Sequence, residues 1–148
     1  MGQRRRAREC ALQMLFQIDL AGGAPGEIYP HFWREHEAEI EVKTFAEGLV
    51  EGVMRRREAL DRVIAEAAEH WRLERMAVVD RNILRMAVYE LAWLPDTPAA
   101  VVLDEAIEVG KKYGSEQSGS FINGILDSVR KRIERGEVPD DLPRGGVP

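Results

Sequence analysis

Residues 78–94, VVDRNILRMAVYELAWL, form the stretch that decides the fold. Apolar side chains recur on nearly every side of a helix drawn through it, at Val79, Ile83, Leu84, Met86, Ala87, Val88 and Leu91. A helix that is apolar all round is normally enclosed by other elements, because a surface helix keeps one polar face. The pattern therefore predicts a helix in the middle of a helical bundle.

Amphipathic patterns with a helical period lie on both sides of this stretch. They predict helices over residues 4–20, from Pro30 into the acidic stretch 34–41, and over 42–54, 60–71, 98–113 and 118–133. No segment shows the strict alternation of a strand. We therefore expect an all-α fold, a compact single-domain bundle of about six or seven helices. This domain spans residues 1–135, and a flexible tail follows at 136–148.

The composition is that of a soluble globular protein. The chain has 148 residues, of which 45% are hydrophobic and 32% charged, and its formal net charge is −5. No apolar run approaches the roughly 18 residues of a membrane span. The single cysteine, Cys10, cannot form an internal disulfide. These features predict a cytoplasmic protein without a membrane partner, in which any nucleic-acid site is local.

An arginine cluster, made of Arg4, Arg5, Arg6 and Arg8, stands at the start of the first expected helix. Cations at a helix N-terminus cost about 0.3–1 kcal/mol each at exposed sites, so helix stability does not explain them. Free backbone N–H groups and guanidinium groups together suit phosphate oxygens. The cluster indicates an RNA contact, although a solvated helix start is the simpler alternative.

Side chains able to read bases follow the arginine cluster on the same helix. Gln13 and Gln17 share a face with Arg6, and Phe16 lies at the boundary of the apolar stripe. Single-stranded RNA is usually selected by aromatic stacking and by amide or hydroxyl groups on base edges. Gln13 and Phe16 are therefore candidate RNA residues, with core packing as the alternative for Phe16.

Motifs for catalysis or for binding metals or cofactors are missing from the sequence. It contains no glycine-rich phosphate loop with its lysine, and His31, His36 and His70 lack metal-ligand spacing. No nucleophile, acid and base fall into a recognisable set. We therefore expect a protein without enzymatic activity, catalytic residues, metal or cofactor.

Four segments in order resemble the NusB family of transcription antitermination factors. They are RRRARECALQMLFQ at 4–17, VVDRNILRMAVYEL at 78–91, VVLDEAIEVGKKYG at 101–114 and SGSFINGILD at 118–127. The resemblance implies an all-helical protein that acts in antitermination, chiefly of ribosomal RNA operons. It implies binding to the boxA element of nascent RNA together with the ribosomal protein NusE, in a complex with NusA, NusG and RNA polymerase.

The resemblance also assigns RNA-binding roles to residues. The arginine cluster matches the family's basic motif, and Phe121 matches the aromatic residue of its FxNG segment. The chain departs from the family at Gln117, where relatives often have an acid, at Ser120, where a lysine can occur, and at Phe16, where a tyrosine is common. These positions are expected at the same RNA surface.

Two more positions carry expectations from the resemblance. Asp80 matches an acidic position in the region where relatives bind NusE, so it is a candidate contact for that basic partner. Gly124 of the FxNG segment is expected to let two helices approach closely.

Three alternatives remain open at this point. A helical adapter that binds only proteins would explain the bundle and the acidic surface, but it would leave the arginine cluster unexplained. The chain could also be the RNA-binding module of an RNA-modifying enzyme. A homodimer could cover the arginine cluster, since some family members self-associate.

Overall fold

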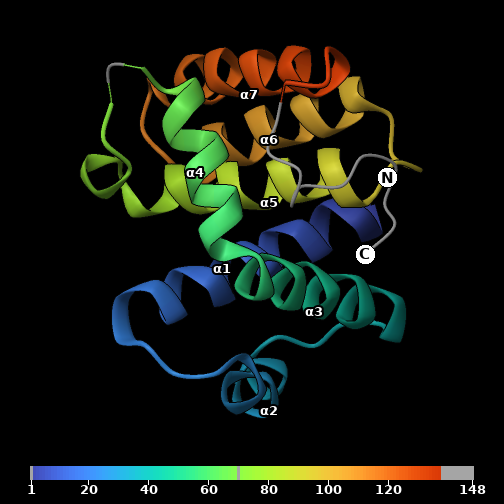
Figure 1. Ribbon diagram of the computed structural model, residues 1–148. Coiled ribbons are helices and arrows are strands. Elements are labelled where there is room, and N and C mark those ends of the chain that lie inside the picture. Colours follow the sequence, from blue (N-terminus) through green and yellow to red (C-terminus); the bar gives the residue numbers. More distant parts are fainter. Residues whose placement is uncertain (1, 70, 138–148) are drawn as a thin grey trace. The chain divides into compact units, whose positions relative to one another are not determined.

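The structure, a computed structural model, describes residues 2–69 and 71–137 of the chain. These residues form seven α-helices and one 3₁₀ turn and contain no strand, which confirms the all-α prediction (Figure 1). The elements are α1 (Gly2–Ala21), α2 (Pro25–Glu35), α3 (Ile40–Arg55), α4 (Arg57–Ala67), η1 (Leu73–Arg75), α5 (Val78–Trp93), α6 (Ala99–Tyr113) and α7 (Ser118–Glu134). The expected tail at 136–148 lies, from residue 138 onward, outside the described residues.

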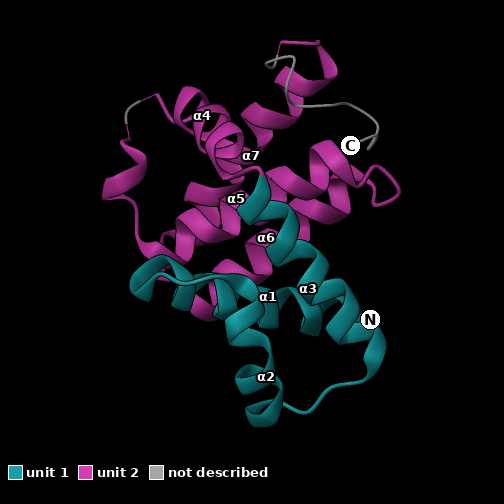
Figure 2. Ribbon diagram, turned by 60° about the horizontal axis from the view of Figure 1, so that its bottom comes forward, with its two compact units in different colours: residues 1–55 teal, residues 56–148 magenta. Residues whose placement is uncertain are grey.

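Contacts along the chain group into two compact units, residues 1–55 and residues 56–148 (Figure 2). Unit 1 holds α1 to α3, and unit 2 holds α4 to α7. The boundary falls in the gap between the helices expected over 42–54 and 60–71. The expectation of a single domain over residues 1–135 stays a prediction.

Unit 1 is built on the packing of α1 against α3, and α2 contacts both of them. The apolar stripe expected on α1 is buried, as are the central residues of the α3 stripe. The buried residues are Ala7, Ala11, Leu12, Met14, Leu15 and Ile18 on α1, and Val42, Ala46, Leu49, Val50 and Val53 on α3. The helical period in the sequence therefore located this core correctly.

The helix α2 differs from the sequence prediction at its start. It begins at Pro25, five residues before the expected start at Pro30, and it ends at Glu35, just inside the acidic stretch as expected. Proline is well suited to the first helical position, and the Glu27 carboxylate accepts a hydrogen bond from the Ala24 backbone N–H at 3.3 Å. Continuing the helix would place glutamates at 35 and 39, and at 37 and 41, in repelling i,i+4 pairs.

Two aromatic side chains bind α2 to α3 within unit 1. The Tyr29 hydroxyl donates a hydrogen bond to Glu51 at 2.8 Å, and Trp33 Nε1 donates to Glu47 at 2.7 Å. Burial, together with the bond to Glu51, raises the pKa of Tyr29 far above its usual value, so the phenol stays neutral. Both donors lie one turn apart on α2 and both acceptors one turn apart on α3, which aligns the two helices.

Unit 2 is organised around α5, which contacts α4, α6 and α7. Its apolar residues are buried on several sides, and so are the polar side chains Asp80, Asn82, Arg85 and Glu90. In Figure 1, α6 and α7 run beside one another in unit 2 while α4 crosses in front of α5. The prediction of a central helix at 78–94 is confirmed.

The expected continuation of the α4 stripe to Trp71 is wrong. The helix ends at Ala67, and Trp71 is 57% exposed in the connector that leads through η1 to α5. The chain must turn back here because α4 and α5 pack against each other. A backbone hydrogen bond from Trp71 N–H to the Ala68 carbonyl, 2.8 Å long, closes this turn.

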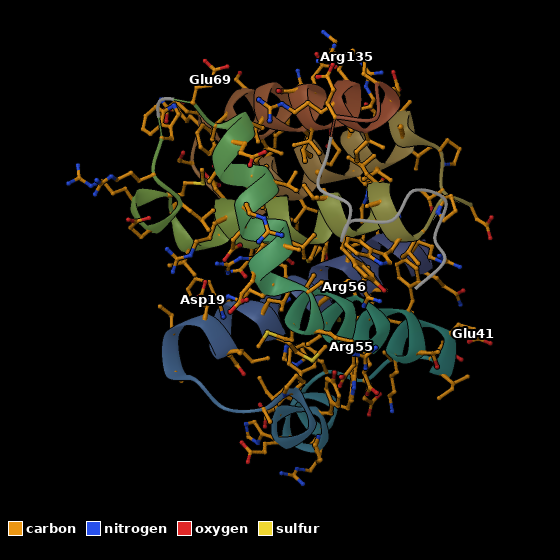
Figure 3. All side chains as sticks on the ribbon, in the orientation of Figure 1. Asp19, Glu41, Arg55, Arg56, Glu69 and Arg135 are labelled. Carbon is orange, nitrogen blue, oxygen red and sulfur yellow. The ribbon has the colours of Figure 1, made fainter. Side chains whose placement is uncertain are left out.

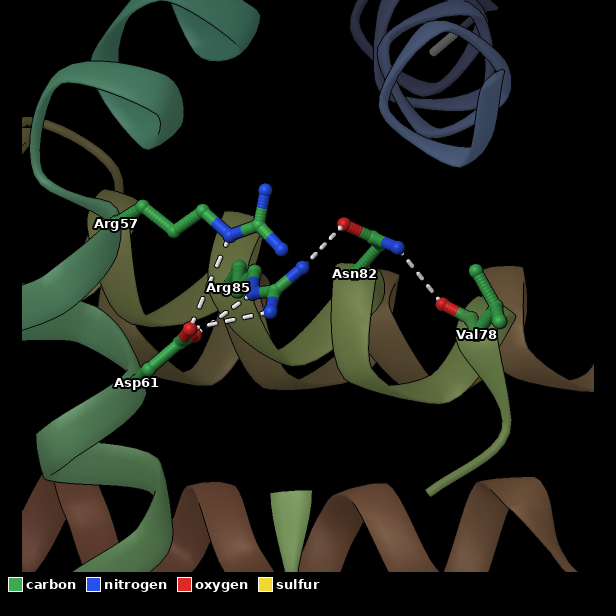
Figure 4. A network of polar contacts seen from close by, with 5 residues as sticks. All are labelled: Arg57, Asp61, Val78, Asn82 and Arg85. Carbon is green, nitrogen blue, oxygen red and sulfur yellow. Dashed lines mark hydrogen bonds and ion pairs between the residues drawn. The ribbon is translucent and has the colours of Figure 1, made fainter. Parts of the chain in front are cut away.

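An ion pair between the buried Arg85 and the partly exposed Asp61 joins α4 to α5 (Figure 4). Arg85, which is only 3% exposed, donates from Nε to Asp61 Oδ1 at 2.7 Å and from Nη2 to Asp61 Oδ2 at 3.1 Å. Its Nη1 donates to Asn82 Oδ1 at 3.1 Å, and the Asn82 amide donates to the Val78 carbonyl at 2.8 Å. The two-bond geometry satisfies a guanidinium that water cannot reach freely.

We expect Asp61→Ala to lower the free energy of unfolding by about 3 kcal/mol, because it leaves the buried Arg85 cation without its carboxylate. Asp127→Ala is the matched control. Asp127 also lies between two cations, Arg130 at 2.7 Å and Lys131 at 3.0 Å, but on an exposed surface. Urea unfolding of both variants tests this, and equal losses would contradict the role of burial.

Candidate nucleic-acid interface

The arginine cluster has two kinds of environment within unit 1. Arg4 lies over the ring of Phe45, with its guanidinium carbon 4.0 Å from the ring centroid, and Arg8 approaches the same ring at 5.6 Å. Arg8 is only 5% exposed, whereas Arg4 and Arg6 are exposed. Arg6 donates a hydrogen bond to the Glu37 carbonyl at 2.8 Å. The cluster is therefore more than a solvated helix start, because Phe45 and the α2–α3 loop hold part of it.

A cleft of about 1010 Å³ opens beside the arginines in unit 1. The start of α1, Trp33 at the end of α2, the loop 37–39 and the start of α3 line it. Its charged side chains have both signs, with Arg4, Arg6 and Lys43 opposing Glu37 and Glu39. This mixture favours neither a polyanion nor a polycation throughout, so the cleft alone does not define a ligand.

The two base-reading candidates on α1 are less exposed than the arginines. Gln13 and Phe16 are half-buried, while Gln17 is exposed. Phe16 is thus neither a full core residue nor an open stacking platform. The side chains of Gln13 and Phe16 still reach the surface of unit 1.

Residues at the start of α7 form an accessible surface in unit 2. The α7 face consists of Gln117, Ser120, Phe121 and Gly124, which share one side of the helix at intervals of three and four residues. Gln117, Ser120 and Gly124 are exposed, and Phe121 is half-buried. An added Cβ at Gly124 would meet no atom within 4 Å, so the expected role of this glycine in close helix approach is wrong.

Gly110 within α6 and Gly114 just after it, rather than Gly124, allow the close approach of α6 and α7. A Cβ at Gly110 would lie 2.8 Å from Ile122 Cδ1, and one at Gly114 would collide with the Ser118 side chain. Ser118 is buried at the first turn of α7. Its hydroxyl accepts a hydrogen bond from the Ser115 backbone N–H at 2.9 Å, which fixes where α7 begins.

Asp80 lies close to the α7 face rather than on a distant surface. It is 8% exposed, and its carboxylate accepts a hydrogen bond from the Ser118 hydroxyl at 2.8 Å. Asp80 also lines a hollow of about 490 Å³ together with Gln117, Ser120 and Phe121. The structure therefore brings the candidate partner residue together with three candidate RNA residues.

Trp71 and Arg75 also line this hollow, and neither was expected at a functional site from the sequence. The rings of Trp71 and Phe121 meet edge to face, with centroids 5.5 Å apart and an angle of 83°. The signal that could have found them was the tryptophan and the arginines in WRLERM, 71–76, a polar connector between two buried helices. The helical period of residues 60–71 instead predicted that Trp71 is a core residue of α4.

The structure offers little for metal or thiol chemistry. Among the described residues, no three His, Cys, Asp or Glu side chains gather as a metal site would require. Cys10 is buried, and burial raises the pKa of its thiol despite the nearby Arg6. Within residues 2–69 and 71–137, no helix has both the length and the apolar character of a membrane span.

The sequence model of the NusB family matches residues 5–131, most of the chain. The chain belongs to the NusB family. Its relatives include the transcription antitermination protein NusB of Anaeromyxobacter dehalogenans strain 2CP-1, which is 52% identical over 139 residues that cover 91% of this chain and 97% of the relative. The NusB protein of Sorangium cellulosum strain So ce56 is 46% identical over 135 residues, covering 91% of this chain and 96% of the relative.

Solved NusB structures share the fold. T. maritima NusB has a TM-score of 0.81 and 36% identity, and the match covers 94% of this chain and 95% of that one. A chain in a crystal structure of the antitermination factors NusB and NusE in complex with dsRNA has a TM-score of 0.80 and 32% identity, covering 88% and 98%. The family confirms the prediction of a transcription antitermination factor rather than an enzyme.

We expect a double-mutant cycle of Arg4→Ala and Phe45→Leu to give a coupling of about 0.5–1 kcal/mol in unfolding free energy, the usual range for an accessible cation–π contact. Leucine keeps apolar volume at residue 45 and removes only the aromatic face. Arg6→Ala with Phe45→Leu is the control cycle, because Arg6 bonds to Glu37 instead. Urea unfolding measures both, and equal coupling in the two cycles would contradict a specific Arg4–Phe45 contact.

Proposed function

We propose that this protein binds the boxA element of nascent ribosomal RNA together with NusE and thereby promotes processive transcription. The observation that carries the proposal is the α7 face, which combines exposed polar residues with the half-buried ring of Phe121 in a chain of the NusB family. A structural neighbour with 32% identity occurs with NusE and dsRNA. Stacking rings beside amide and hydroxyl groups suit unpaired bases.

The proposed role of each RNA-binding residue follows from the solvent exposure of its side chain. Arg4, Arg5 and Arg6 contact phosphates, and the buried Arg8 supports them from beneath through the ring of Phe45. Gln13 and Phe16 extend this surface along α1. Gln117, Ser120 and Phe121 contact bases from α7. With a net charge of −5, the rest of the chain limits binding to RNA that engages these residues.

NusE is the proposed protein partner. Asp80 stays a candidate contact for this basic protein, although its carboxylate also accepts the Ser118 hydrogen bond. We further propose that the pair joins NusA, NusG and RNA polymerase in the cytoplasm. Self-association into a homodimer that covers the arginine cluster would regulate access to RNA. We also propose that residues 1–135 act as one RNA-binding domain.

A comparison of boxA-type RNA with a scrambled RNA of equal length tests the proposal, with and without NusE across a salt series. We expect boxA to bind more tightly in the presence of NusE. An Arg5→Ala/Arg6→Ala variant should bind more weakly, and its log–log salt dependence should be shallower by about 0.7 per lost single-strand phosphate contact. Absence of RNA binding by the pair would instead favour a purely protein-binding adapter.

We expect Gln117→Asp to weaken boxA binding several-fold at low salt, because it adds a carboxylate to the RNA surface. Gln117 is exposed and its side chain caps no backbone group of α7, so the variant should fold as the natural chain does. Gln117→Asn is the control of similar shape without charge. The difference should shrink as salt screens the repulsion, and equal affinity of the two variants at low salt would contradict the prediction.

A further inference from the structure

The rings of Trp71 and Phe121 stand between two hollows in unit 2. The first, which we name the Arg75 hollow, measures about 490 Å³ and contains Arg75, Gln117 and Asp80 in its lining. The second, the Glu69 hollow, measures about 410 Å³ and contains Glu69 and Gly124. Both hollows share Trp71, Ser120 and Phe121. An aromatic pair therefore forms a common wall that a ligand can reach from either side.

The indole of Trp71 is available to a ligand. In an edge-to-face pair, one ring presents its edge and the other presents one face, so at least one face of the indole is not used by Phe121. Trp71 is 57% exposed, although an apolar ring of this size is usually covered in a folded protein. An open aromatic face beside polar side chains is the arrangement on which unpaired bases stack.

Charge distinguishes the two hollows. Arg75 is exposed, and its side chain makes no hydrogen bond or ion pair within the described residues. The neighbouring Arg72 instead pairs with Glu74 at 4.0 Å. On the other side of the aromatic pair, Glu69 lies at the outside of unit 2 at the end of α4 (Figure 3). A phosphate is attracted to the Arg75 hollow and repelled from the Glu69 hollow.

We propose that the Arg75 hollow binds one unpaired RNA nucleotide, whose base stacks on Trp71 and whose phosphate pairs with Arg75. This inference rests on the proposed function and adds a base-binding residue and a phosphate contact outside the motifs that the sequence suggested. The Gln117 amide and the Ser120 hydroxyl line the same hollow and offer donors and acceptors to the base edge. The Asp80 carboxylate also lines this hollow, where it accepts the Ser118 hydrogen bond, so the Arg75 cation is needed there to offset its repulsion of a phosphate.

The test measures boxA-type RNA binding by the full chain with NusE for Trp71→Ala, Trp71→Phe, Arg75→Ala and the matched control Arg72→Ala. We expect Trp71→Ala to weaken binding roughly 5- to 150-fold, the range of one base–aromatic stack. Trp71→Phe, which keeps an aromatic face, should lose less. Arg75→Ala should reduce the log–log salt slope by about 0.7, and Arg72→Ala should not change it.

A second readout follows the indole directly. RNA should quench the tryptophan fluorescence of the natural chain, and Trp71→Phe should remove most of that quenching. Trp93 is buried, whereas Trp33 is half-buried and lines the cleft beside the arginine cluster, so any quenching that remains in Trp71→Phe is assigned to Trp33. Trp71 is largely exposed, so its replacement removes little buried area and the variants should fold.

The outcomes separate this inference from the proposed function. If the natural chain prefers boxA but Trp71→Ala and Arg75→Ala bind it equally well, the nucleotide site is refuted and the proposed function stands. If the natural chain shows no preference for boxA even with NusE, the proposed function itself fails. If Trp71→Ala weakens binding to NusE in the absence of RNA, the hollow belongs to the protein partner, and the inference is overturned.

Discussion

The burial of α5 is the constraint on which unit 2 depends. Because most of this helix is removed from water, each of its polar side chains must find a partner inside the protein. Arg85 donates hydrogen bonds to Asp61 on α4, and Asp80 accepts a hydrogen bond from Ser118 at the start of α7. Among the described residues, no buried side-chain nitrogen or oxygen lacks a hydrogen-bond partner. The polar groups of α5 therefore fix the positions of two other helices.

The polar contacts of α5 also position the residues of the candidate interface. The connector that carries Trp71 follows directly from α4, which the Arg85–Asp61 pair holds against α5. Phe121 lies one turn after Ser118, whose hydroxyl is bonded to Asp80. Both rings of the aromatic pair are thus placed by bonds to the same central helix. Rigid placement matters because a stacking surface that must be ordered on binding loses part of its affinity to entropy.

The sequence was sufficient for the fold class, the central helix and the apolar stripes of α1 and α3, because helical periodicity reports burial directly. It was misleading at the start of α2, where two prolines, Pro25 and Pro30, both suit the first helical position. It also assigned Trp71 to the α4 stripe. Periodicity indicates which residues of a helix face the core, but it does not show where the chain must leave the helix to turn back.

The candidate site was predictable in part. The arginine cluster was predicted from a basic run, and Phe121 was predicted from a family motif. Both patterns are local in sequence. The hollow around the aromatic pair joins residues 71–80 to residues 117–121 through tertiary packing, so no local pattern could show it. The burial of Arg8 was equally hidden, since nothing in RRRARE tells which arginine faces Phe45.

The number of base-reading groups limits what this chain can select by itself. Stacking on Trp71 or Phe121 tolerates any base, because every base has a π-face. Only hydrogen bonds to base edges discriminate, at about 1–3 kcal/mol for a well-made pair of bonds, and the Arg75 hollow offers the Gln117 amide and the Ser120 hydroxyl for this purpose. These two groups, together with the Gln13 amide proposed on α1, distinguish only a few bases. Selection of a longer RNA element therefore requires edge contacts from a second protein, which makes specificity a property of the complex.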